Sequence, residues 1–330
     1  MNQNSCFNQM HTGQTPQSMS TTDTVADPSE YSAPDRFAVL IADGGATKTE
    51  WVALDRNGCR IGHHISLGAN AVVTPREEMC LLFKETALHL PHPDEGAEIY
   101  YYGAGCATPE ISRSVESALK SAWPAASADV ASDMLGAARG LLGRERGIAC
   151  ILGTGSNAAL CDAGEIMKGI TSLGFILGDE GSGAALGKRF FADYFKGYLP
   201  GNIKEDFDRE YGYGIGDVLT RVYKQPSPNR FLASIAPFLC RHSDSPYIRA
   251  MLIKEFAEFF KHYIATFEGA RHLPIAFTGS IADHFERPLR DAADSLGFKV
   301  SKIVGSPMAG LIDYHSAPLN HARKAASDNQ

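Results

Sequence analysis

The sequence predicts an α/β protein with two similar halves, each of which begins with strands around a glycine-rich turn. In residues 39–54 an apolar, β-branched run ends in Asp43-Gly-Gly-Ala-Thr-Lys-Thr49, and a second apolar run follows at once. Residues 148–160 repeat this order around Gly-Thr-Gly-Ser-Asn. The two units lie roughly one domain length apart. This spacing predicts a duplicated fold with a phosphate-binding hairpin in each half.

Composition limits the classes of protein to consider. The chain has 330 residues, of which 44% are hydrophobic, so it can form two domains with apolar cores. The net charge of −7 argues against a nucleic-acid partner, and no apolar run is long enough to cross a membrane. The seven cysteines are scattered and lack CxxC spacing, which is typical of buried thiols in a reducing cytoplasm. We therefore expect a cytoplasmic protein with a small-molecule substrate.

The first 35 residues differ in composition from the rest. They are rich in Ser, Thr, Gln and Asn, and they contain no Lys or Arg. They also lack the apolar core of a signal peptide. We predict that residues 1–35 form a disordered tail whose deletion leaves activity and melting temperature nearly unchanged.

The first half is predicted to have the order βββαβαβα. The expected strands are residues 37–43, 50–55, 60–66, 98–102 and 128–131. The expected helices are residues 76–90, 109–123 and 133–142. Proline stands before or at the start of the first two helices, where its missing N–H costs nothing.

The second half begins with the same meander and contains more helices. The expected strands are residues 148–153, 158–161, 166–170, 274–278 and 299–304. The expected helices are residues 182–196, 204–211, 216–223, 230–240, 246–268 and 283–296, with a closing helix from Pro307. The aromatic residues of helix 246–268 recur at helical spacing, which predicts a core-facing stripe.

The first glycine-rich turn has features of a phosphate site. Gly44 and Gly45 let the backbone approach a ligand and offer amide donors, and Thr47 adds a hydroxyl. Asp43, at the end of a strand, is suited to a hydrated Mg²⁺. Because a strand follows the turn, it is neither a P-loop nor a dinucleotide turn. An ordinary hairpin is the alternative.

Other polar residues also stand at ends of predicted strands. Asp133 follows Ser132 where a strand meets a helix, which fits either a helix cap or a catalytic base. Asp179 and Glu180 lie between small residues in a turn before a helix. Asn70 follows the first meander, and its amide can read paired sugar hydroxyls.

Four pieces stand in an order and spacing that resemble a known family: residues 43–49, 153–157, 178–182 and 278–281. Over residues 37–317 the chain resembles the N-acetylglucosamine kinase branch, also called the BadF/BadG/BcrA/BcrD ATPase family, of the sugar kinase, actin and heat-shock protein superfamily. The resemblance implies two ribonuclease-H-like (actin-like ATPase) domains, each βββαβαβα, with the nucleotide between them. It places the domains at residues 36–142 and 143–306, with a C-terminal helix, 307–320, packing back on the first.

The resemblance also implies ATP and Mg²⁺ as cofactors and assigns roles to residues. It makes Asp133 the catalytic base and Asp43 the metal ligand. The implied ATP- and phosphate-binding residues are Gly44, Gly45, Thr47, Lys48, Gly153, Thr154, Gly155, Gly279 and Ser280. The implied sugar-binding residues are Asn70, Gly105, Asp133, Thr154, Gly155, Asn157 and Asp179. Whether Glu180 is catalytic or structural stays open.

Several functions remain in view. The first is phosphorylation of N-acetylglucosamine at O6, and kinases of glucosamine or N-acetylmuramic acid share every motif. The second is an ATPase that activates a dehydratase, as in the BadF type, where two cysteines hold an iron–sulfur cluster. Cys150 has a suitable offset, but a second downstream cysteine is missing. The third is a sugar-sensing regulator, which would need a DNA-binding segment. The sequence also leaves a homodimer open.

Overall fold

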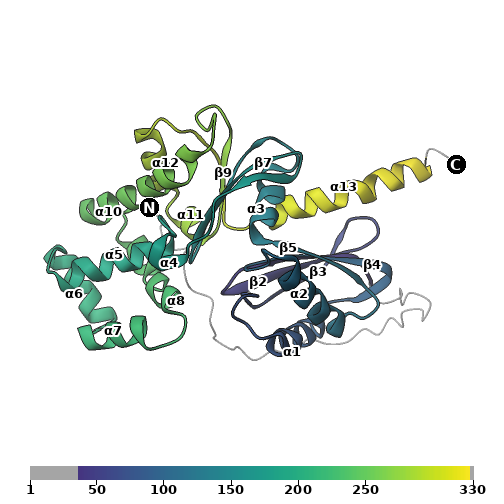
Figure 1. The fold of residues 1–330 in the computed structure, drawn as a ribbon, viewed down its shortest axis with the longest axis horizontal. Helices are drawn as coiled ribbons and strands as arrows, with labels where there is room; N and C mark the ends of the chain where they lie inside the picture. The colour runs from purple at the N-terminus through teal and green to yellow at the C-terminus, as the bar shows by residue number, and fades with distance from the viewer. Residues whose placement is uncertain (1–35, 328–330) are drawn as a thin grey trace, which may run out of the picture. The chain divides into compact units, whose positions relative to one another are not determined.

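The structure, a computed structural model, describes residues 36–327, so the predicted tail at 1–35 lies outside the described residues. The first half contains a five-stranded sheet with the order β3-β2-β1-β4-β5 (Figure 1). Its strands are β1 (Arg36–Gly44), β2 (Lys48–Leu54), β3 (Arg60–Leu67), β4 (His92–Gly103) and β5 (Ser127–Ser132). β1 pairs antiparallel with β2 and parallel with β4, so β1 lies at the centre of the sheet.

The alternation of side chains along β1 decides what covers each face of this sheet. Leu40 faces one core, to which α1 and α2 contribute apolar residues. Val39 and Ile41 face the other, where Met308 and Leu311 of the C-terminal helix α13 pack. The helices concerned are α1 (Arg76–Ala87), α2 (Pro109–Ala122), α3 (Asp133–Leu142) and α13 (Met308–Ser327).

The second half contains a sheet of the same design. Its order, β10-β9-β6-β7-β8, repeats that of the first sheet when the strands are matched in chain order. Its strands are β6 (Gly147–Leu152), β7 (Ser156–Asp162), β8 (Glu165–Gly169), β9 (Ile275–Thr278) and β10 (Val300–Val304). The predicted duplication and the α/β fold class are confirmed.

The helices of the second half differ in part from the prediction. They are α4 (Gly174–Leu177), α5 (Gly183–Phe195), α6 (Gly201–Glu210), α7 (Ile215–Tyr223), α8 (Pro228–Ala233), α9 (Ala236–Arg241), α10 (Pro246–His262), a 3-10 turn (Ile264–Thr266), α11 (Ser280–His284) and α12 (Glu286–Ser295). The single helix predicted at 230–240 is two helices, because Pro237 cannot donate to the carbonyl of Ala233. Pro288 likewise divides the helix predicted at 283–296.

Two further boundaries were wrong. The helix predicted to end at residue 268 ends at His262, and β4 begins at His92 rather than near residue 98. The aromatic stripe of α10 is nevertheless core, as predicted. Phe256, Phe259 and Phe260 are completely buried in the core beneath the second sheet.

Helices α3 and α13 cross with their backbones in contact. α3 packs apolar residues against the second sheet, whereas α13 packs against the first. A Cβ atom on Gly310 would lie 1.9 Å from the carbonyl oxygen of Gly140, so both positions need glycine. The domain boundaries predicted at residues 142 and 306 stay a prediction.

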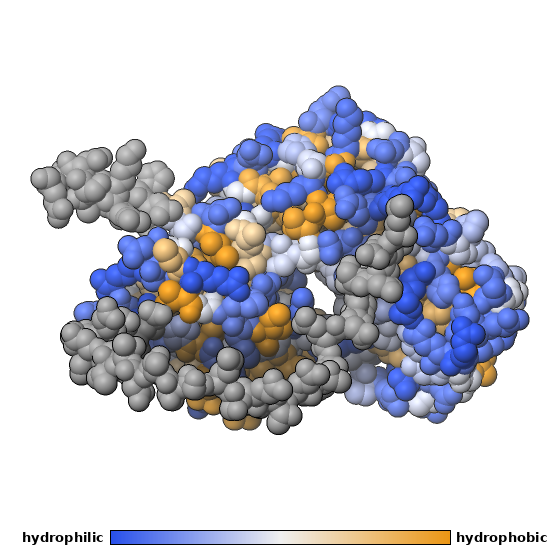
Figure 2. Space-filling view, turned by 180° about the vertical axis from the view of Figure 1, so that it is seen from behind, coloured by the Kyte–Doolittle hydropathy of each residue, from blue (hydrophilic) through white to orange (hydrophobic). Residues whose placement is uncertain are grey.

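In the part of the chain that the structure describes, no helix is both long and apolar enough to span a bilayer. Figure 2 shows a face on which hydrophilic residues predominate and hydrophobic residues form small, separate groups.

Candidate active site

The strand register brings two carboxylates to one edge of the first sheet. Gly44 of β1 lies opposite Gly103 of β4, and Gly103 lies opposite Ser132 of β5. Asp43 and Asp133 therefore stand at the same edge, with one strand between them. Asp133 is the first residue of α3, and Ser132 caps that helix by accepting from the N–H of Leu135 at 3.2 Å. The helix-cap reading and the catalytic reading of this pair are compatible.

Burial raises the pKa of both carboxyl groups, and the charge of Asp133 adds to the shift at Asp43. The pKa of Asp43 is raised from 3.8 to about 7, first by burial and then by the charges of Asp133 and Glu50, while Lys48 opposes the shift. Burial also raises the pKa of Asp133 to about 6, although its carboxylate accepts from the N–H of Met134 at 2.8 Å. The site thus concentrates negative charge that a bound cation would relieve.

The first glycine turn is closed by its own hydrogen bonds. The N–H of Gly45 donates to the carbonyl oxygen of Lys48 at 2.9 Å. We expected this amide to be a free donor for phosphate, but it is used within the turn. Among the described residues, the N–H groups of Ala46 and Thr47 donate to no acceptor. The N–H of Gly68, which follows β3, donates to the carbonyl oxygen of Thr47 and stabilises the turn. The available donors in the turn are therefore the amides of Ala46 and Thr47.

The second glycine turn has the same construction. The N–H of Gly153 donates to the carbonyl oxygen of Gly155 at 2.9 Å, so this amide too is used inside its turn. Within the described part of the chain, the N–H groups of Thr154 and Gly155 have no acceptor. A Cβ atom at Gly153 would meet no protein atom within 4 Å, so the protein itself does not require glycine there. The space beside the turn at this position is therefore open.

The motif at residues 278–281 lies against the end of β6, directly before this second turn. A Cβ atom on Gly279 would lie 2.3 Å from the carbonyl oxygen of Leu152, and Gly279 has a φ of 108°. Both facts require glycine. Ser280 begins α11 directly behind it. The buried hydroxyl of Thr278 has no hydrogen-bond partner among the described residues.

Asp179 also joins the second turn. Its carboxylate accepts from the N–H of Ser156 at 3.4 Å, and a Cβ atom on Gly155 would lie 3.1 Å from it. Its own N–H donates to the hydroxyl oxygen of Tyr263 at 3.2 Å, and burial raises the pKa of its carboxyl group. Asp179 has a φ of 59°, a left-handed conformation that non-glycine residues adopt at a cost and that is frequent at functional sites.

The predicted asparagines have partners close to them in sequence. Asn70 accepts from the N–H of Val72 at 3.0 Å, and its amide oxygen packs on Gly105, where a Cβ atom would lie only 2.5 Å away. Asn157 accepts from the N–H of Ala158 at 2.8 Å. The structure therefore brings Asn70 and Gly105 together in the first half, and Asn157, Asp179 and the second turn together in the other half.

Sequence reasoning missed two tyrosines at the site. The hydroxyl of Tyr101 lies beneath Gly44, where a Cβ atom would come within 2.8 Å of it. The buried Tyr263 was assigned to the apolar stripe of α10, yet its hydroxyl meets Asp179. An apolar stripe reports burial of the ring and gives no information on the phenol group. Only the tertiary contact reveals its role.

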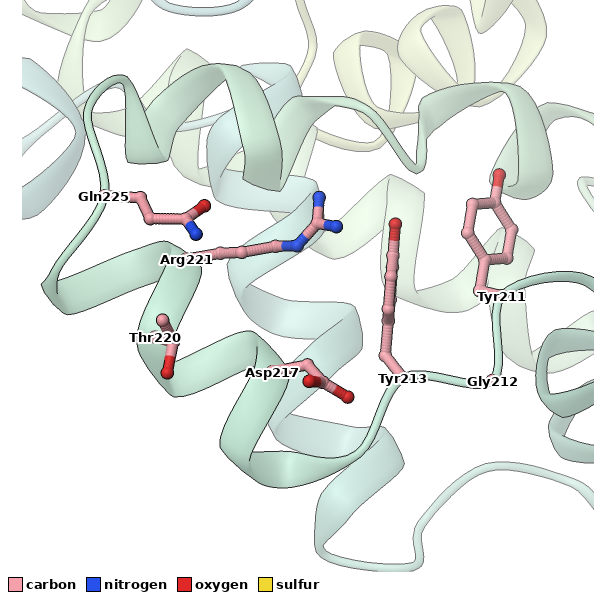
Figure 3. A pocket seen from close by; sticks show the side chains of 7 residues that line it. All are labelled: Tyr211, Gly212, Tyr213, Asp217, Thr220, Arg221 and Gln225. Carbon is pink, nitrogen blue, oxygen red and sulfur yellow. The ribbon is translucent and has the colours of Figure 1, made fainter.

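A cavity of about 410 Å³ lies elsewhere, lined by α7 and by the segments that precede and follow it, with residues such as Tyr213 and Arg221 (Figure 3). None of the predicted site residues lines it.

The described residues contain no cluster of three or more His, Cys, Asp or Glu side chains that could hold a metal. Cys150 is completely buried in the second sheet, where burial holds the pKa of its thiol well above the usual range. This position does not suit a cluster shared between two subunits.

Comparisons with known proteins identify the family. A candidate N-acetylglucosamine kinase from Porphyromonas gingivalis is similar in structure with a TM-score of 0.77 and 38% sequence identity, over 84% of this chain and 98% of that chain. This chain belongs to the N-acetylglucosamine kinase family. A candidate N-acetylglucosamine kinase from Chromobacterium violaceum shares the fold of this family member at 17% identity, with a TM-score of 0.67 over 85% of this chain and 99% of that one. No protein-family model and no curated protein matches the chain.

Proposed function

We propose that this protein is an ATP-dependent kinase that transfers the γ-phosphoryl group to O6 of N-acetylglucosamine or a related amino sugar. Membership in a sugar kinase family supports the reaction class. One structural observation supports the site. Asp43 and Asp133 stand at one sheet edge beside a glycine turn that has unused amide donors.

Asp133 is the proposed general base. With a pKa of about 6, its carboxylate is mostly ionised at pH 7 and yet basic enough to take the proton of a sugar hydroxyl. Its place at the N-terminus of α3 fixes the carboxylate through the N–H of Met134. Phosphoryl transfer depends mainly on such positioning and on stabilisation of charge.

The two glycine turns are the proposed phosphate site. The free amides of Ala46, Thr47, Thr154 and Gly155 and the open space at Gly153 fit the phosphate chain of ATP. Gly44, Gly45 and Gly153 act by shaping the turns. The remaining proposed nucleotide contacts are Thr47, Lys48, Gly279 and Ser280.

Asp43 is the residue that we propose holds Mg²⁺. Its oxygens are the hard donors that Mg²⁺ prefers, and its raised pKa marks a site where a cation is favourable. Mg²⁺ is usually held by one or two carboxylates with phosphate oxygens and water, so a three-residue cluster is not needed. When bound, the ion would neutralise charge on the phosphate oxygens.

The proposed sugar pocket is built from two sets of residues. Asn70, Gly105 and Asp133 come from the first half, and Thr154, Gly155, Asn157 and Asp179 come from the second. Asp179 is held by Tyr263 and Ser156 and can accept hydrogen bonds from sugar hydroxyls.

The test is an ADP-release assay on the full chain with MgATP and a panel of N-acetylglucosamine, glucosamine, N-acetylmuramic acid, glucose and mannose. The Asp133→Asn variant gives the background of ATP hydrolysis and contaminating kinases. We expect turnover with one amino sugar, lowered about 10²- to 10⁴-fold in the variant. Equal rates with and without every sugar, or near-normal turnover by the variant, would refute the proposal.

A further inference from the structure

Arg230 reaches the first glycine turn from the second half of the chain. It lies in the first turn of α8, and its guanidinium donates to the backbone carbonyl oxygen of Ala46. Among the described residues, no carboxylate forms an ion pair with it. A guanidinium has five N–H donors in a planar fork, so one carbonyl leaves most of them unused. A permanent charge of this kind beside a free amide is suited to an anion.

Helix α8 packs on α5, and α5 is hydrogen-bonded to the second glycine turn. A Cβ atom on Gly187 of α5 would lie 1.9 Å from the carbonyl oxygen of Leu232, so α5 and α8 touch backbone to backbone. Near the start of α5, Gly183 packs on Ala233, and its N–H donates to the carbonyl oxygen of Gly153. Helix α8 is therefore connected through α5 to the second glycine turn, while its Arg230 side chain contacts the first.

The backbone just before Arg230 is unusual. Ser227 is left-handed, with φ 56° and ψ 48°, and Pro228 follows at the first helical position. The N–H of Arg230 donates to the carbonyl oxygen of Ser227 at 3.0 Å, which closes the first turn of the helix. A left-handed serine costs free energy, and such residues persist where surrounding contacts impose them. The left-handed serine and the proline define the start of the helix that carries Arg230.

The charge balance of the turn calls for a further cation. The carboxyl groups of Asp43, Asp133 and Glu50 lie close enough to interact there, and Lys48 is a cation beside them. A nucleoside triphosphate brings several more negative charges to the same place. A second fixed positive charge would stabilise that arrangement, because charge-assisted hydrogen bonds from arginine to phosphate are strong and often bidentate.

We propose that Arg230 is a nucleotide-binding residue that exchanges the carbonyl oxygen of Ala46 for the terminal phosphate oxygens of the nucleotide. The inference rests on the proposed function, in that it takes the two glycine turns as the phosphate site. It assigns one residue of the helical segment α6–α9 to that site. Because Arg230 comes from the opposite half, phosphate binding by this residue also links the two glycine turns.

The test is isothermal titration calorimetry of the full chain with MgATP, MgADP, AMP and adenosine in the absence of sugar. The variants are Arg230→Gln, Arg230→Lys and the control Arg209→Gln, which removes an exposed charge that pairs with Asp206 on α6. We expect Arg230→Gln to weaken MgATP about 10- to 100-fold, MgADP less, and adenosine not at all. Arg230→Lys should recover part of the loss, and the control should match the wild type.

The outcomes separate this inference from the proposed function. Wild-type affinity for MgATP in Arg230→Gln, or an equal loss for ATP and adenosine, overturns the role of Arg230 and leaves a sugar kinase possible. A protein that binds MgATP through Arg230 but releases no ADP with any sugar refutes the sugar kinase alone. Melting curves without ligand check the fold. If Arg230→Gln is destabilised, the test uses Arg230→Lys, which keeps the positive charge but loses the planar fork of donors. A ratio of MgATP affinity to adenosine affinity in Arg230→Lys that equals the wild-type ratio then refutes the inference.

Discussion

The clearest quantitative prediction concerns the stability of the ligand-free protein after the substitution Asp43→Asn. The pKa of Asp43 rises from 3.8 to about 7 because the carboxyl group is buried next to Asp133 and Glu50. In the unfolded chain it titrates near its ordinary value. Between about pH 4 and pH 7 the folded state thus holds a proton that the unfolded state has lost. The contribution of the Asp43 carboxyl group to the free energy of unfolding is complete at low pH and is lost as the pH rises through 7.

The size of the effect follows from the shift. About three pKa units at about 1.4 kcal/mol each give roughly 4 kcal/mol for a fully buried carboxylate. The side chain of Asp43 is only partly buried, so we expect about 2 kcal/mol. Asparagine has nearly the same shape and does not titrate. The free energy of unfolding of Asp43→Asn minus that of the wild type should therefore increase by about 2 kcal/mol between pH 4.5 and pH 8.

The assay is urea unfolding followed by circular dichroism at several pH values, in EDTA and without nucleotide. Using the difference between variant and wild type removes the contributions of titrating groups that do not interact with Asp43. Asp313→Asn, which alters an exposed carboxylate on α13, is the matched control. A flat or falling curve for Asp43→Asn would refute the reasoning about the site. Adding MgATP should stabilise the wild type more than Asp43→Asn, because only the wild type keeps the proposed metal ligand.

Three further predictions test the surrounding structure. Gly310→Ala should lower the free energy of unfolding by at least about 1–3 kcal/mol in urea titrations, since its Cβ atom would lie 1.9 Å from the carbonyl oxygen of Gly140. Burial, followed by the charge of Arg139, lowers the pKa of His315 to about 4, so the wild type should lose stability relative to His315→Gln as the pH falls from 6.5 to 4. Tyr263→Phe removes the phenol group that holds Asp179 and should raise KM for the sugar several-fold while KM for ATP stays unchanged, as initial-rate kinetics would show.

The parts of the fold that are encoded locally were predictable from the sequence. Alternating or continuous apolar runs that end at Gly44 and Gly153 indicated the strands and their turns, and these lie where expected. Helix breaks were harder to predict. Pro237 stands at the second position of α9, where proline is tolerated, so the aromatic and leucine pattern around it suggested one continuous helix.

The site was predictable only as a set of separate motifs. Asp43 stands near the end of β1 and Asp133 directly follows β5, and the register of β1, β4 and β5 brings them to one edge of the sheet. Arg230 gave no such signal. Arg230 stands 184 positions from Ala46, and a contact at that separation depends on how α8 packs against α5. Sequence periodicity describes what an element buries, and long-range polar contacts leave no trace in it.

The helix that carries the proposed base is held firmly at its other end. Arg139 of α3 donates to the hydroxyl oxygen of Tyr102 at 2.9 Å in the first sheet and to Glu165 at 2.8 Å in the second. Tyr102 in turn lies 2.8 Å from the ring nitrogen of His315 on α13. Arg139 lies about 9 Å along α3 from Asp133, at 1.5 Å per residue. Any change in the angle between the sheets must therefore rearrange these hydrogen bonds or carry α3 with it. The position of the Asp133 carboxylate is thus coupled to a polar network that contains none of the proposed sugar- or ATP-binding residues.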